Sequence, residues 1–221
     1  MLGNLFKALY QMSDPAFRAV IWRTFFLSLM LFSTLLVSLW WLLANTQYFQ
    51  WGWLDSTVDF LGGIAALIGA LFLYPGATMI IISFMLDPIV RAVEAKHYPN
   101  LEPIRRQPVL EVVMIAARFT TITVLLNLIA LPLYFIPVLN VFVFGALNGY
   151  LLGREYFELI APRRLDQEAV KSMWRSCRGR LWLAGLVITL LLSIPFINWI
   201  MPVPAVAFMV HIFEELRKNE A

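Results

Sequence analysis

The sequence contains little charge, and its charged residues are unevenly placed. Asp, Glu, Lys and Arg make up 14% of the 221 residues, whereas 61% are hydrophobic and the mean hydropathy is +0.76. Four stretches contain no charged residue at all: 24–54, 60–86, 119–153 and 181–213. A water-soluble domain carries about 25% charged residues and lacks apolar runs of this length. The composition therefore excludes a soluble protein and indicates an integral membrane protein.

Residue types that catalytic, redox and metal sites need are scarce. Cys177 is the one cysteine, so no internal disulfide and no CxxC site can form. His97 and His211 are too far apart in the sequence to bind a metal as a pair on one helix. The chain has no P-loop, no dinucleotide-binding glycine motif and no zinc or serine hydrolase motif. We therefore expect no enzyme activity, no cofactor and no bound metal.

The basic residues lie between the apolar stretches. A pI of about 9.2 would suggest a nucleic-acid partner for a soluble domain, but in membrane proteins Lys and Arg gather on the cytoplasmic side. All 17 fall in the two terminal segments, in 87–118 and in 154–180, and none falls in 45–59. We therefore expect both termini and the two basic segments in the cytoplasm, residues 45–59 outside, and no nucleic-acid partner.

Residue patterns predict an all-α integral membrane protein that forms one membrane domain, residues 1–221. The apolar positions of residues 1–12 have helical spacing, which is typical of a short interfacial helix. Ser13-Asp14-Pro15 then reads as a cap followed by a first-turn proline, so a new helix should begin there and form a first span over 15–44. Residues 60–86 are long enough for a second span. Residues 166–179 predict an amphipathic helix.

The third and fourth apolar stretches are expected to enter and leave the membrane by the same face, because the charged segments on both sides of each are cytoplasmic. Prolines interrupt both near the middle, at Pro132 and Pro137 and again at Pro195 and Pro202. Each arm keeps roughly 12–16 residues, or roughly 18–24 Å of helix, which is short of a crossing. The pattern therefore predicts two re-entrant helical hairpins, over 109–153 and 181–213.

The expected hairpin tips imply neighbours. Irregular backbone at membrane depth is tolerated only where protein or water shields it, and two full spans cannot shield both tips. We therefore expect a homo-oligomer with membrane lipids around it. Gly62 and Gly69 in the second span would let another helix approach closely, within or between protomers.

Five segments then make the chain resemble a known family. They are SDPAFR at 13–18, LDPIVRAVEAK at 86–96, LYFIP at 133–137, NGYLLGREYFELIAPRR at 148–164 and IPFINWIMPV at 194–203. In this order and spacing they resemble the CysZ sulfate permeases of the etoposide-induced protein 2.4 family. The resemblance implies a bacterial inner-membrane protein with two full transmembrane helices and two hemi-penetrating hairpins. It also implies an oligomer and uptake of sulfate, or a similar oxyanion, for cysteine synthesis.

The resemblance points to a sulfate site at the start of the first long helix. The family associates a Gly-x-Arg-Arg-like turn with sulfate, and here those positions read Ala16-Phe17-Arg18-Ala19, so Arg18 alone carries over. A helix N-terminus offers free N–H groups beside the guanidinium, which favours an oxyanion on Arg18 and the amides of Ala16 and Phe17. Asp14 argues against this site, since a capping carboxylate would take the same donors. The alternative is that Arg18 only anchors the topology.

Polar residues at the hairpins are candidates for a permeation path. Asn140 and Asn198 lie near the two expected tips, where they would line a pore or tie helices together. Arg118, Arg154 and Glu155 lie at the expected bases, where they would form a gate or an interfacial salt-bridge cluster. The spacing of His211 and Glu214 indicates local pairing rather than catalysis.

A second function of a different class fits the same pattern. Wedge-like hairpins and interfacial helices would equally serve a non-transporting protein that shapes membranes or scaffolds partners, and an intramembrane enzyme is a more distant third. Sulfate flux into liposomes that contain this protein alone separates the first two functions.

Overall fold

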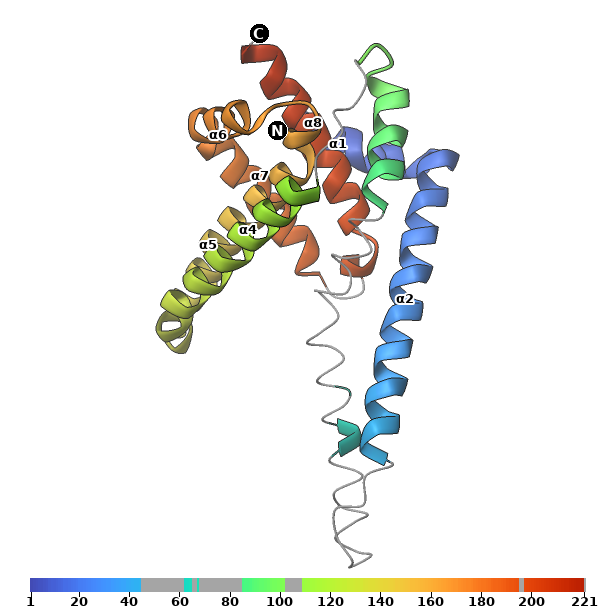
Figure 1. Ribbon diagram of the computed structural model, residues 1–221, viewed down its shortest axis with the longest axis vertical. Coiled ribbons are helices and arrows are strands. Elements are labelled where there is room, and N and C mark those ends of the chain that lie inside the picture. Colours follow the sequence, from blue (N-terminus) through green and yellow to red (C-terminus); the bar gives the residue numbers. More distant parts are fainter. Residues whose placement is uncertain (45–61, 65–66, 68–84, 102–108, 195–196, 221) are drawn as a thin grey trace, which may run out of the picture. The chain divides into compact units, whose positions relative to one another are not determined.

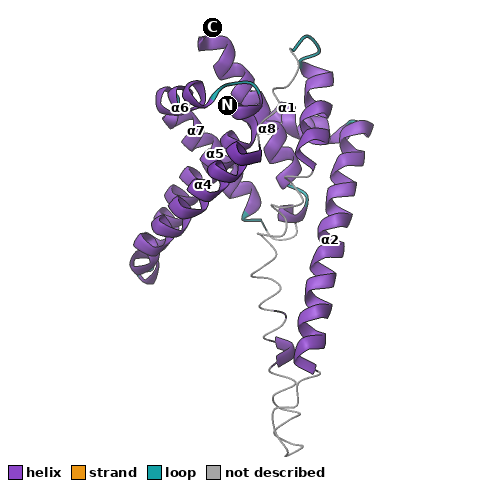
Figure 2. Ribbon diagram, in the orientation of Figure 1, coloured by secondary structure: helices purple, strands orange, loops and turns teal. Residues whose placement is uncertain are grey.

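The computed structural model describes residues 1–44, 62–64, 67, 85–101, 109–194 and 197–220, and all regular structure in these residues is helical (Figures 1 and 2). The chain forms two compact units. One combines Met1–Arg18 with Pro88–Ala221, and the other is Ala19–Asp87. The all-α class is thus confirmed for these residues, while the single membrane domain stays a prediction.

Most of the unit Ala19–Asp87 that is described belongs to one long helix. This helix, α2, runs from Pro15 to Ala44, which matches the predicted first span. Over Pro15–Leu42 its hydropathy is 2.0, and among the described residues it is the one helix long and apolar enough to cross a membrane. Thr24 and Thr34 donate their hydroxyl protons to backbone oxygens four residues earlier, at 2.9 and 2.8 Å. Polar side chains in lipid need such partners.

The predicted second span at 60–86 lies almost wholly outside the described residues, as do the 45–59 loop and Gly69. Around Gly63 there is nothing within 4 Å of the position that a Cβ would take. The second span and its role in helix packing therefore stay predictions.

The N-terminal helix α1, Leu2–Tyr10, buries Asn4 and Ala8 and exposes large apolar side chains. Asn4 donates to the carboxylate of Glu215, and Gln11 in the following turn donates to the Ala92 carbonyl at 3.2 Å. Leu2 and Phe6 are 70% and 67% exposed. Such an outward apolar stripe is what an interfacial helix requires.

Two helix–turn–helix hairpins form where the prolines predict them. The first consists of α4 (Val109–Ala130), a 3₁₀ turn at Leu131–Phe135 that contains Pro132, and α5 (Leu139–Ile160). The second consists of α7 (Arg178–Leu192), a 3₁₀ turn at Ile197–Trp199, and α8 (Pro202–Glu220). Pro202 opens α8 because a first-turn proline gives up no helical hydrogen bond. How deep the hairpins enter a membrane stays a prediction.

The two hairpins cross at glycines. Gly149 and Gly153 of α5 face Gly185 of α7, so closely that a Cβ on Gly185 would overlap the Gly149 carbonyl oxygen and the Gly153 amide and lie 2.6 Å from the Gly153 Cα. Trp182 donates its indole N–H across the crossing to the Ala146 carbonyl at 3.0 Å. Backbones can approach this closely only where side chains are absent.

The amphipathic helix expected at 166–179 is α6, Gln167–Ser176. Asp166 caps it, because its carboxylate accepts the Ala169 amide proton at 2.8 Å. It ends earlier than expected. Gly179 does not terminate it but lies in the first turn of α7, because Cys177 already breaks the helical path with φ −106° and ψ 16°. The 3₁₀ turn Ala161–Arg163 leads from α5 toward α6.

The charged ends of these elements meet. Arg164, which follows that turn, contacts Glu94 of the helix at 85–97 at 2.5 Å and Glu214 of α8 at 3.5 Å. Arg180, at the start of α7, pairs with Glu215 near the end of α8. The hairpin bases, the helix at 85–97 and the C-terminal turns thus gather at one end of their unit, away from the 3₁₀ tips (Figure 1).

Candidate functional site

The sulfate site predicted from the sequence lies at the first turn of α2. Ala16 and Arg18 are exposed there, and Phe17 is fully buried. Pro15 begins the helix, and the Arg18 amide already donates to the Asp14 carbonyl at 2.8 Å. An oxyanion at this turn would therefore find the Arg18 guanidinium at the surface.

Asp14 caps this turn. Its carboxylate accepts the Ala16 amide proton at 2.9 Å and pairs with Lys96 at 2.9 Å. The Lys96 hydrogen bond, followed by that of the Ala16 amide, lowers the pKa of Asp14. An oxyanion that used the Ala16 amide would have to displace this carboxylate, so the competition foreseen from the sequence exists. The site on Ala16, Phe17 and Arg18 stays a prediction.

The asparagines near the hairpins differ in their partners. Asn127 and Asn148 donate to backbone oxygens of their own helix four residues earlier, at 2.8 and 2.9 Å, so these bonds do not tie two helices together. Asn140 is exposed beside the first 3₁₀ turn. Asn198 lies in the 3₁₀ turn Ile197–Trp199 of the second hairpin, and its Oδ1 atom is buried with no hydrogen-bond partner among the described residues. Their role in a pore stays a prediction.

Of the candidate gate residues, Arg154 and Glu155 lie toward the base of the first hairpin in α5, whereas Arg118 lies near the middle of α4 and not at its base. Arg154 is 7% exposed and bonds within α5, to Glu158 at 2.8 Å and to the Tyr150 hydroxyl at 3.4 Å. Glu155 is half-buried beside it. The Arg118 side chain lies outside the described part of the structure. The Arg154–Glu158 bond fits the salt-bridge interpretation, and a gate stays a prediction.

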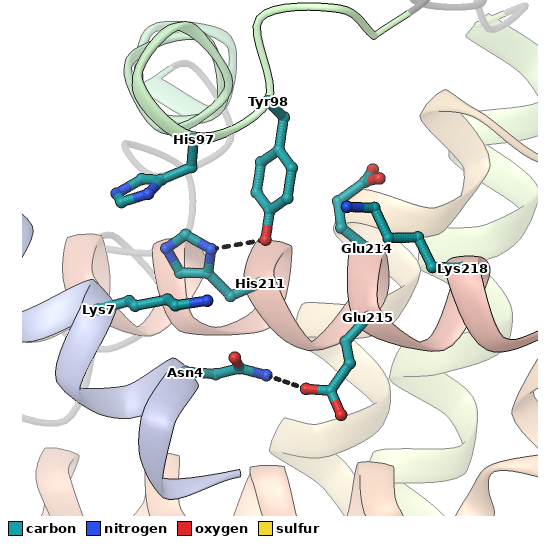
Figure 3. Close-up of a pocket in the computed structure, with 8 residues that line it drawn as sticks. All are labelled: Asn4, Lys7, His97, Tyr98, His211, Glu214, Glu215 and Lys218. Atoms are coloured by element: carbon teal, nitrogen blue, oxygen red, sulfur yellow. Dashed lines mark hydrogen bonds between the residues drawn. The ribbon is translucent and has the colours of Figure 1, made fainter.

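A polar pocket of about 360 Å³ lies where α1, the end of the helix at 85–97 and α8 meet (Figure 3). Asn4 and Lys7 face it from α1. His97 and Tyr98 face it from the end of the helix at 85–97 and the residue after it. The α8 residues that line it are His211, Glu214, Glu215 and Lys218. Their spacing places them on one face of that helix.

Two histidines distant in the sequence meet in this pocket. The rings of His97 and His211 are perpendicular, with centroids 4.9 Å apart. His211 is 1% exposed, and its Nδ1 is 2.9 Å from the Tyr98 hydroxyl. Burial, with smaller contributions from Lys96 and Lys7, lowers the pKa of His97. Burial, with Glu214 and Glu215, raises the pKa of Tyr98 to about 12, so this hydroxyl keeps its proton at neutral pH.

Arginines outside the pocket pair with its two carboxylates. Glu214 is 2.7 Å from Arg217 and 3.5 Å from Arg164. Glu215 accepts from Arg180 and Asn4, and these two hydrogen bonds lower its pKa. In the part of the chain that the structure describes, Lys7 forms no ion pair. The pocket is therefore lined by two lysines and by two carboxylates that arginines outside it already pair with.

Sequence reasoning missed this pocket. The predicted pairing of His211 with Glu214 was wrong. His211 is hydrogen-bonded to the Tyr98 hydroxyl, and the Glu214 carboxylate is paired with Arg217 and Arg164. A signal was available: positions 211, 214, 215 and 218 carry His, Glu, Glu and Lys at helical spacing after a long apolar stretch.

The described residues form helices, and one of these helices is long and apolar enough to cross a membrane. The chain belongs to the family described as Sulfate transporter CysZ/Etoposide-induced protein 2.4, whose model matches residues 4–202. The resemblance found in the sequence is thus confirmed over most of the chain. A comparison with curated proteins gives no match. The matched segment includes Arg18 and both 3₁₀ tips but ends before His211.

Proposed function

We propose that this protein is a permease or channel of the bacterial inner membrane that takes up sulfate, or a similar oxyanion, for cysteine synthesis. The observation that carries the proposal is the family match over residues 4–202, since the family is described as a sulfate transporter. The apolar helix α2, long enough to cross a bilayer, supports a membrane location. The two hairpins would enter the membrane from the cytoplasmic side, and several protomers would together shield their tips.

Energetics constrains such a route. Moving a dianion inward against about 100 mV costs roughly 4.6 kcal/mol, at roughly 2.3 kcal/mol per charge. A passive route therefore depends on the cell consuming the sulfate. A purified protein in liposomes should carry sulfate down its concentration gradient, and the rate should fall when the inside is made negative.

Replacing Arg18 tests the proposed anion site. Losing one charge-assisted contact costs roughly 1.5–3 kcal/mol, so Arg18→Ala should weaken sulfate binding by about 10- to 100-fold. Sulfate flux into liposomes, measured at sub-saturating sulfate, should fall accordingly. Arg18→Lys should recover part of the flux if charge matters more than bidentate geometry.

The matched control is Arg175→Ala, which removes an exposed arginine from the polar face of α6 and should leave flux unchanged. Wild-type flux in Arg18→Ala would contradict the site and leave Arg18 as a topology anchor. Both variants must insert normally, which equal membrane yield and equal elution in detergent would establish.

The distribution of basic residues supports a topology with both termini in the cytoplasm. In a Cys177→Ser background, a cysteine at position 101 should react with an impermeant thiol reagent only after the cells are opened. A cysteine at Gln50 should react in intact cells, because the 45–59 loop is expected outside. Labelling at position 101 from outside would refute the orientation, and equal labelling from both sides would indicate dual topology.

The alternative is a protein that shapes membranes without transport. The first hairpin favours it, because Phe135 and Val138 at its tip are 80% and 77% exposed and would wedge into one leaflet. The same liposomes separate the two functions. A transporter gives sulfate flux without a change in vesicle size, whereas a shaping protein gives small or tubular vesicles and no flux.

A further inference from the structure

The pocket formed by α1, the end of the helix at 85–97 and α8 contains a buried ring nitrogen with no hydrogen-bond partner among the described residues. The Tyr98 hydroxyl lies 2.9 Å from His211 Nδ1, and which of the two donates depends on the histidine tautomer. When the hydroxyl donates, a neutral His211 carries its own proton on Nε2. This Nε2 atom is the buried one without a partner. Buried polar groups are rarely left unpaired, so a protonated Nε2 calls for an acceptor.

The charges around His211 favour an anionic acceptor. Figure 3 shows its ring between Tyr98, His97 and Lys7. Lys7 and Lys218 are exposed at the mouth, and Lys218 also lies 5.5 Å from the Tyr98 ring. Glu214 and Glu215 also line the pocket, on the same helix as His211, but their oxygens are taken by arginines and by Asn4.

A cation is a poor fit to the same groups. Two lysines would repel it, and the described residues contain no cluster of three or more His, Cys, Asp or Glu side chains that could hold a metal. The volume of about 360 Å³ accommodates a tetrahedral anion with its hydration water, since each water takes about 30 Å³.

We propose that this pocket binds a tetrahedral oxyanion, which the Nε2–H of His211 meets from the floor and the ammonium groups of Lys7 and Lys218 meet from the mouth. The ligand is either a free sulfate or phosphate ion or the phosphate group of an anionic lipid. The site is separate from the turn at Arg18, and its α8 residues lie beyond the segment 4–202 that matches the family. It does not depend on the proposed transport function.

The chain itself supplies the reporter. Its two histidines both line this pocket, so histidine labelled with ¹³C and ¹⁵N gives two sets of ring signals, both from the site. The Arg18→Ala protein, in nanodiscs of phosphatidylcholine, is titrated with sulfate and then with phosphate. We expect a saturable shift of the His211 signals and a stronger Nε2–H tautomer signature. The Arg18→Ala background removes the other candidate site from the measurement.

Two variants and one control test the arrangement. Lys7→Ala should weaken binding by about 10- to 100-fold, the effect of one charge-assisted contact. Tyr98→Phe removes the donor to Nδ1, so it should shift His211 toward the Nδ1–H tautomer and weaken binding. Lys171→Ala, on the exposed face of α6, should change nothing.

The lipid source is tested without added anion, by comparing nanodiscs of phosphatidylcholine with nanodiscs that contain phosphatidylglycerol. A Lys7-dependent shift with phosphatidylglycerol alone assigns the site to a lipid headgroup, and one with sulfate or phosphate assigns it to a free ion. Unchanged histidine signals in both experiments, or shifts that survive in Lys7→Ala, would overturn the proposal. Flux is measured separately, so such a failure leaves the transport proposal standing.

Discussion

Gly185→Ala is expected to separate the two hairpins. A Cβ at this position overlaps backbone atoms of Gly149 and Gly153 rather than flexible side-chain ends, so relief requires α5 and α7 to move apart. Overpacking a core destabilises a protein by about 1–3 kcal/mol and occasionally more. A clash with backbone should cost at least the upper value, because backbone cannot change rotamer to relieve it. We expect a loss of about 3 kcal/mol or more in unfolding free energy, measured by tryptophan fluorescence in mixed micelles.

The glycines of α5 provide a graded control. A Cβ at Gly145 has its nearest neighbour, the Leu186 Cδ1 atom, at 3.6 Å, an ordinary contact. Because alanine favours a helix over glycine by about 1 kcal/mol, Gly145→Ala should leave stability unchanged or raise it. Gly153→Ala, whose Cβ would overlap the Leu181 carbonyl, should be destabilising like Gly185→Ala. Equal stability of Gly145→Ala and Gly185→Ala would show that the crossing does not depend on glycine.

Local signals were sufficient for the ends of several helices. Ser13-Asp14-Pro15 predicts a helix start, and α2 begins at Pro15 and continues to Ala44, where the predicted span ends. Pro132 lies in the first hairpin turn and Pro202 opens α8. These features are set by backbone donors and by φ within a few residues, so they can be read from the sequence.

Only one side of the hairpin crossing, the glycines of α5, could be predicted from the sequence. Gly145, Gly149 and Gly153 are spaced four apart, a pattern typical of close helix packing, and the sequence reading passed over it in favour of the second span. Their partner, Gly185, has no second glycine four residues away in α7, and no local pattern connects it to α5.

The polar pocket could not be predicted from the sequence. The Tyr98–His211 hydrogen bond joins residues 113 positions apart, and helical periodicity says which residues share a face but not which helix that face meets. Arg164 was therefore interpreted only as one of the basic residues that set the topology. In the structure Glu94, Arg164 and Glu214 are also joined to one another.

The ion pairs of that base lead to the second large effect. Arg164→Ala should destabilise the unit by about 3 kcal/mol, because the change leaves the largely buried carboxylate of Glu94 without its cation. Its side chain is 6% exposed, and those of Glu94 and Glu214 are 14% and 1% exposed. Glu214 would keep Arg217 at 2.7 Å, whereas the described ion pairs of Glu94 include no second cation.

The neighbouring pair on the same helix is the control. Arg180 bonds to Glu215, one residue beyond Glu214, but both side chains are more than a third exposed, at 38% and 39%. Arg180→Ala should therefore cost no more than about 1 kcal/mol, as exposed ion pairs do. Adding Glu94→Gln to Arg164→Ala should recover part of the loss, because the unpaired charge is then removed. Reversible unfolding in mixed micelles measures all three proteins. A loss in Arg164→Ala no larger than that in Arg180→Ala would contradict a buried network that holds α8 to the helix at 85–97.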